Sequence, residues 1–135
     1  MFVLYNLYNT NCMTNNNYKS QLLSSWEETY KKGQLTFWLL LSLQDKPLYI
    51  NEIQTFIASK TKGTITCENQ SLYRSLRKYY DLEIVDYELK EGSKGPDRKY
   101  YFLTTLGKEL LNEFIQRNIK LFYNKELTDL INQTK

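Results

Sequence analysis

The 135-residue sequence contains no histidine. Histidine is the commonest general base and the commonest metal ligand in proteins, so its absence weakens any assignment as an enzyme or a metalloprotein. The sequence also lacks a glycine-rich phosphate-binding loop, and the adjacent carboxylates Glu27 and Glu28 would diverge on a helix. We therefore expect a protein that is not an enzyme and that needs no metal or cofactor.

Cysteines and long apolar segments are also scarce. Cys12 and Cys67 lie far apart without metal-binding spacing, so free thiols in a reducing cytoplasm are favoured over a redox switch at Cys67. The longest apolar run, Phe37 to Leu41, is much too short to span a bilayer. The first residues lack the basic segment and the cleavage site of a secretory signal. We expect a cytoplasmic protein with no membrane partner.

The N-terminal part of the chain divides into a polar tail and a helical arm. Residues 1–17 are rich in asparagine and have little to bury, which predicts a disordered tail. Met13 is an alternative initiator within it. Residues 18–32 form the arm, where apolar side chains at helical spacing predict an amphipathic helix from Ser20 to Lys31.

Residues 33–104 carry the pattern of a small domain. The stretch from Gln34 to Gln44 is apolar on nearly all sides, which predicts a buried helix that Pro47 ends. Two more helices, a very short strand at one residue and a pair of longer strands are predicted after it: Ile50–Ser59, Ile65, Asn69–Tyr80, Ile84–Leu89 and Arg98–Leu103. This order predicts a mainly α fold with a small β-hairpin wing, a winged helix-turn-helix.

The helix predicted from Asn69 to Tyr80 has two different faces. Four residues spaced three and four apart form a buried stripe: Leu72, Ser75, Leu76 and Tyr79. The residues outside the stripe are hydrogen-bonding, aromatic and cationic groups: Gln70, Ser71, Tyr73, Arg74, Arg77 and Lys78. Such groups read base edges and phosphates, so this helix is the predicted recognition helix of a DNA-binding protein.

Within this DNA-binding surface the residues are expected to play different roles. The first residues of a recognition helix reach base edges, which assigns readout to Gln70, Ser71 and Arg74. Phosphate contacts are expected from the later residues of the helix and from the turn before it: Arg77, Lys78, Lys60 and Lys62. The hairpin loop adds a basic wing that is expected to contact the DNA backbone or the minor groove: Lys94, Arg98 and Lys99.

Net charge does not by itself favour nucleic acid. The formal net charge of the whole chain is +3, and the segment from Glu68 to Lys99 holds seven basic and seven acidic side chains. Affinity for DNA would therefore depend on where the charges lie and not on their sum. This balance supports the alternative function, a winged helix that binds partner proteins without binding DNA.

The C-terminal segment, residues 105–135, predicts a dimerisation helix. Thr104 is its expected N-cap, one long helix is expected from Thr105 to Tyr123, and Gly107 is expected to pack closely against the domain. The apolar arc is broader than one domain can cover, so a second copy of the chain is the expected partner. The interface residues predicted on the two terminal segments are Leu22, Trp26, Leu111, Phe114, Ile115, Ile119 and Phe122.

Three motifs occur in order along the chain: Lys32-Gly33-Gln34-Leu35 with Pro47-Leu48-Tyr49-Ile50-Asn51-Glu52-Ile53, then Ser71-Leu72-Tyr73-Arg74-Ser75-Leu76, then Gly95-Pro96-Asp97-Arg98-Lys99-Tyr100-Tyr101-Phe102-Leu103-Thr104-Thr105-Leu106-Gly107. Together they resemble the PadR family of bacterial transcriptional regulators. Three motifs in the right order are far more specific than one. Two departures stand out, because Ile50-Asn51 replaces the usual Gly-Tyr and Arg74 replaces the usual proline.

The resemblance implies a winged helix-turn-helix, a homodimer formed through the terminal helices, and binding of double-stranded operator DNA, commonly as a repressor. It names no effector. A cavity for a small aromatic effector between two protomers is left open by four aromatic residues: Trp26, Trp38, Phe114 and Phe122.

Overall fold

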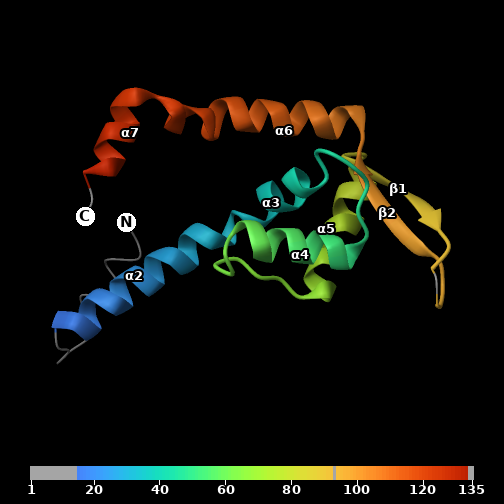
Figure 1. The fold of residues 1–135 in the computed structure, drawn as a ribbon, viewed down its shortest axis with the longest axis horizontal. Helices are drawn as coiled ribbons and strands as arrows, with labels where there is room; N and C mark the ends of the chain where they lie inside the picture. Colours follow the sequence, from blue (N-terminus) through green and yellow to red (C-terminus); the bar gives the residue numbers. More distant parts are fainter. Residues whose placement is uncertain (1–14, 93, 134–135) are drawn as a thin grey trace. The chain divides into compact units, whose positions relative to one another are not determined.

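The computed structural model describes residues 15–92 and 94–133. Their elements follow the chain in the order α2, α3, α4, α5, β1, β2, α6, η1 and α7, where η1 is a 3₁₀-helix (Figure 1). The chain divides into two compact units, Met1–Phe37 and Trp38–Lys135. Among the described residues, no helix combines the length and the apolar character needed to cross a membrane.

The N-terminal arm is one helix, α2, over Asn15–Lys32. It begins earlier than the expected Ser20, so the end of the predicted tail, residues 15–17, is helical. The rest of that tail, with Met13 and Cys12, lies outside the described residues. Leu23, Trp26 and Tyr30 recur along α2 and are exposed. The helix thus keeps the predicted amphipathic spacing.

The core of the second unit is built from three helices, α3 (Leu35–Ser42), α4 (Ile50–Lys60) and α5 (Asn69–Asp81). Each ends within a few residues of its predicted position. Apolar side chains of these helices, and Leu43 directly after α3, fill the interior: Leu39, Leu40, Leu43, Ile53, Ile57, Leu72 and Leu76. Such spacing on α4 and α5 buries one face of each helix and leaves the other face to solvent, as the sequence predicted.

The hairpin consists of β1 (Val85–Lys90) and β2 (Arg98–Leu103), paired antiparallel. The backbone of Leu48 pairs with Tyr101 on the free edge of β2, where Leu48 N donates to Tyr101 O at 3.0 Å and Tyr101 N donates to Leu48 O at 2.8 Å. The loop between α3 and α4 therefore adds a short third piece to the sheet.

The short strand predicted at Ile65 is wrong. The backbone N–H of Ile65 donates to the hydroxyl of Thr61 at 3.2 Å, and this hydroxyl lies 2.6 Å from the carbonyl of Ile57 and 3.1 Å from that of Ile65. The N–H of Ile65 is thus bonded at the end of α4 and is not left for a sheet.

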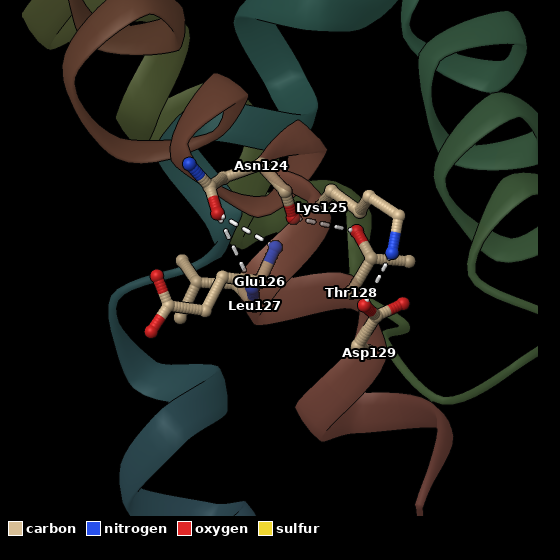
Figure 2. A network of polar contacts seen from close by, with 6 residues as sticks. All are labelled: Asn124, Lys125, Glu126, Leu127, Thr128 and Asp129. Carbon is tan, nitrogen blue, oxygen red and sulfur yellow. Dashed lines mark hydrogen bonds and ion pairs between the residues drawn. The ribbon is translucent and has the colours of Figure 1, made fainter.

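The single C-terminal helix predicted from Thr105 to Tyr123 is also wrong. The structure has three pieces there, α6 (Thr105–Asn118), η1 (Lys120–Tyr123) and α7 (Lys125–Asn132). After α6 the backbone bonding tightens, with Phe122 N donating to Ile119 O at 3.0 Å three residues back. Figure 2 shows how α7 then begins: Asn124 Oδ1 accepts from the backbone N–H groups of Glu126 and Leu127 at 2.9 and 3.3 Å. An asparagine side chain that caps a new helix starts that helix at its own position.

A threonine on α7 reinforces the break. The hydroxyl of Thr128 contacts the carbonyl of Phe122 at 3.0 Å and that of Asn124 at 2.9 Å. The Phe122 carbonyl would bond a backbone N–H in a continuous helix, so the side chain replaces the helical bond. The ion pair between Lys125 and Asp129, at 2.7 Å, spans one turn of α7 beside it (Figure 2).

The start of α6 packs against the hairpin as predicted. Thr104 is the N-cap, with its hydroxyl accepting from Gly107 N at 3.1 Å and contacting the carbonyl of Glu83 at 2.6 Å. Gly107 is buried, and a Cβ built there would collide with the carbonyl oxygen of Ile84. The absence of a side chain at 107 therefore lets α6 lie against the strand that leads into β1.

Adding one methyl group at this contact tests its importance. Gly107→Ala should lower the free energy of unfolding by about 1–3 kcal/mol, because overpacking outweighs the better helix propensity of alanine. Thermal or denaturant unfolding measures the change. Gly33→Ala is the matched control, because its added Cβ meets no atom within 4 Å. Equal stability of Gly107→Ala and the wild type would show that the contact is not tight.

Candidate nucleic-acid interface

The position of α5 is fixed by the segment that joins it to α4. Gln54 on α4 donates through Nε2 to the carbonyl of Cys67 at 2.7 Å, directly before α5. Gly63 N donates to Ala58 O at 2.7 Å, and Lys62 and Gly63 both have a positive φ, of 53° and 75°. The chain thus turns sharply after α4, as a helix-turn-helix requires, and is held at both ends of the turn.

The outward face of α5 carries the residues predicted to meet DNA. Gln70, Arg74 and Arg77 are exposed and recur four and three residues apart, so they form one stripe opposite Leu72 and Leu76. Lys78 is exposed beside the stripe, and Ser71 is partly buried. These residues therefore share one accessible side of the helix, as predicted.

Tyr73 faces a different way from this stripe. It is half exposed and lines a cleft with residues of the hairpin. Burial raises the pKa of Tyr101 on β2, and charge repulsion from Tyr73 and Tyr87 raises it further. About two turns later on the same side, Tyr80 packs against Tyr87 with ring centroids 5.3 Å apart. Tyr73 and Tyr80 therefore hold α5 against the hairpin.

The three cations of the wing are all exposed. The guanidinium carbon of Arg98 lies 4.6 Å from the ring centre of Tyr49, and Lys99 Nζ lies 4.6 Å from that of Tyr87. Residues 98 and 99 lie on opposite faces of the hairpin because side chains alternate along a strand. The wing thus carries positive charge on both faces.

A cleft of about 380 Å³ lies between α5, the start of α4 and the wing. It brings four of the predicted DNA-contacting residues together: Tyr73, Lys94, Arg98 and Lys99. Asp97 also lines the cleft and is its one carboxylate among the described residues. The exposed Lys60 and Lys62 lie instead at the end of α4 and in the following turn.

Three of the seven acidic residues between Glu68 and Lys99 gather elsewhere. Asp81, Glu83 and Asp86 line a separate groove of about 700 Å³, beside the end of α5 and the beginning of β1. The wing cleft lies at the other end of the hairpin, next to Lys94 and Arg98, and holds Asp97 as well. The charges of this segment are therefore partly separated, which the sum of charges did not reveal.

The structure gives no support to a redox switch. Burial raises the pKa of the Cys67 thiol, which disfavours the reactive thiolate at neutral pH. Within residues 15–92 and 94–133, no group of cysteine, aspartate and glutamate side chains is arranged to hold a metal ion.

Sequence reasoning did not single out Tyr49, which lines the wing cleft. Its contact with Arg98 depends on the pairing of Leu48 with Tyr101, which joins residues far apart in the chain. The available signal was the alternation of β2, which places Arg98 and Tyr100 on one face.

The match to a known protein family covers the helix-turn-helix and the hairpin. The family model described as "Transcriptional regulator PadR-like family" matches residues 39–113, from α3 through most of α6. An uncharacterized protein of Lysinibacillus sphaericus is 28% identical over 99 residues, which cover 73% of this chain and 88% of that protein.

Solved structures share this fold. A PadR-like transcriptional regulator from Bacillus cereus is 26% identical, with a TM-score of 0.61, and the match covers 76% of this chain and 96% of that one. PadR of Bacillus subtilis, solved in complex with operator DNA, is 19% identical with a TM-score of 0.57. That match covers 62% of this chain and 46% of the B. subtilis chain. The likeness confirms the predicted fold class, a mainly α winged helix-turn-helix.

Proposed function

Because this chain belongs to the PadR-like family of transcriptional regulators, which are not enzymes, we propose that it binds operator DNA as a homodimer and acts as a repressor. The observation that carries the proposal is the exposed stripe of Gln70, Arg74 and Arg77 on α5, next to a wing with three exposed cations. The exposed face of such a helix suits the major groove, and a basic hairpin beside it suits the adjacent DNA backbone.

Base readout is assigned to the beginning of α5. Gln70 can form two hydrogen bonds with adenine, and Arg74 can form two with guanine. The first turn of α5 holds no acidic side chain, and Glu68, its N-cap, makes no side-chain capping bond. The first N–H groups of α5 are therefore not taken by a side-chain cap, but the carboxylate of Glu68 at this helix end opposes a phosphate there.

Phosphate binding is assigned to the surrounding cations: Lys60, Lys62, Arg77, Lys78, Lys94, Arg98 and Lys99. In the described part of the chain, the ion pairs are formed by Lys31, Arg117 and Lys125, none of which belongs to this group. A cation without a carboxylate partner within the protein can neutralise a phosphate without first breaking an ion pair.

Dimerisation is assigned to the terminal helices. Leu106, Leu110 and Phe114 recur every four residues along α6 and are each more than 40% exposed. Trp26 on α2 and Phe122 in η1 are also exposed, whereas Leu111 is buried within the protomer and cannot offer a docking face. A soluble monomer rarely exposes so many large apolar side chains. A second copy would cover them and place two recognition helices on one operator.

The central test is salt-dependent binding to the chain's own promoter region. The logarithm of affinity should fall linearly with the logarithm of salt concentration, with a slope of about −0.9 per neutralised phosphate. Lys94→Ala should weaken all sequences about equally and reduce the slope by about 1. If the wild type showed no salt-dependent binding to duplex DNA, the protein-interaction alternative would be favoured instead.

A substitution on α5 separates base-specific recognition from the sequence-independent attraction to DNA phosphates. Arg74→Ala should weaken operator binding by about 1–3 kcal/mol and relax the preference at one base pair. A shift assay with single-base operator variants measures both effects. Arg117→Ala removes the same charge from α6, where Arg117 is paired with Glu113 at 3.4 Å, and should change neither. Unchanged sequence preference in Arg74→Ala would remove Arg74 from the readout group.

The dimer surface is tested by adding a charge to the exposed stripe of α6. Leu110→Glu should shift the protein towards the monomer, because an unpaired carboxylate is costly to bury in an apolar interface. Sedimentation or light scattering measures the mass. Asn112→Glu adds the same charge at an exposed position outside the stripe and should leave the dimer intact. Equal dimerisation of the two variants would exclude this face.

A further inference from the structure

We propose that Tyr49 is a positioning residue for Arg98 and fixes the wing against the start of α4. The inference rests on the proposed DNA binding. Neither the sequence patterns nor the resemblance to the PadR family had linked Tyr49 to DNA binding. Tyr49 is partly buried and lines the cleft between α5 and the wing, next to Arg98 and Lys94.

The contact is a cluster of two cations and two tilted tyrosine rings. Arg98 Cζ lies 4.6 Å from the ring centre of Tyr49, and the Tyr49 and Tyr100 rings lie 5.5 Å apart with an angle of 56° between their planes. Lys90 Nζ lies 4.6 Å from the ring centre of Tyr100. The face of a tyrosine ring attracts a cation, and the flat guanidinium suits such stacking better than an ammonium does.

The Tyr49 ring is attached to a rigid piece of backbone. On one side, Leu48 is paired with Tyr101 by two hydrogen bonds. On the other side, Tyr49 is the N-cap of α4, where its carbonyl accepts from Glu52 N at 2.9 Å and its own N–H donates to Glu52 Oε1 at 3.2 Å. Tyr49 therefore cannot move without disturbing the sheet edge or the first turn of α4.

Two lysines of the hairpin are held differently. Lys99 lies over Tyr87, and Lys90 lies over Tyr100, so each of these contacts joins two residues of the hairpin itself. Arg98 over Tyr49 joins the hairpin to α4. This contact can therefore set the orientation of the wing relative to the helix-turn-helix, whereas the two lysine contacts cannot.

This geometry leaves Arg98 able to bind DNA. Stacking uses the flat face of the guanidinium, while its N–H groups lie around the edge and remain available to phosphate oxygens. An exposed arginine loses rotamer freedom when it binds, and holding the side chain beforehand reduces that loss. Tyr49 thus contributes to affinity through Arg98, without a phosphate contact of its own.

The experiment is a double-mutant cycle on operator DNA. Tyr49→Leu should reduce affinity about two- to fivefold, the size of an exposed cation–ring contact, and Tyr49→Phe, which keeps the ring, should recover most of that loss. In an Arg98→Ala background, Tyr49→Leu should have little further effect. Additive losses in the double variant, or equal losses in the leucine and phenylalanine variants, would overturn the proposal.

A measurement without DNA separates this proposal from the proposed function. The side-chain Nε–Hε signal of Arg98 in an NMR spectrum should be shifted by the ring current of Tyr49. Tyr49→Leu should remove that shift, while the backbone signals remain those of a folded protein. A protein with the shift but no DNA binding would contradict the proposed function alone. A protein that binds DNA with salt dependence but shows no such shift would contradict the role of Tyr49 alone.

Discussion

The two hydrogen bonds between Leu48 and Tyr101 join the helix-turn-helix of this domain to its wing. They join the loop that starts α4 to the strand that forms the wing. Leu48 faces the core and is buried, while Tyr49, the next residue, lies at the wing cleft. Because neighbouring residues on an extended backbone face opposite ways, one pairing anchors the hairpin to the core and also aims a ring at Arg98. The helix-turn-helix and the wing therefore keep a defined relation to each other.

Charge distribution matters more than net charge in this surface. The outward stripe of α5 and the wing tip are cationic, while Asp81, Glu83 and Asp86 lie together near the base of the hairpin. A phosphate backbone approaching the wing would meet the cations first, with the acidic groove at the other end of the hairpin. A segment with no net charge can in this way still attract one face of a polyanion.

The sequence predicted the elements whose formation depends on local periodicity. The helices and strands of the central domain, the N-cap at Thr104 and the close packing at Gly107 agree with the structure, because apolar spacing and capping chemistry can be read along the chain. The prediction failed at Ile65, where the hydroxyl of Thr61 takes the backbone N–H, and after Asn118, where the chain changes to 3₁₀ bonding. The side chains of Asn124 and Thr128 then start a separate helix. The role of Tyr49 was missed because it depends on a contact between distant residues, which periodicity does not encode.

The break at Asn124 makes the C-terminal end of the chain a separate short helix. The final helix, α7, spans Lys125–Asn132 and has no buried residue, and Leu130 and Ile131 are exposed on it. A helix this short gains too little from its own hydrogen bonds to be stable in water. Its capping network lowers the cost of starting the helix but provides no apolar contact. Under the proposed dimerisation, a second copy that covered Leu130 and Ile131 would stabilise this helix, and its helicity would then rise with protein concentration.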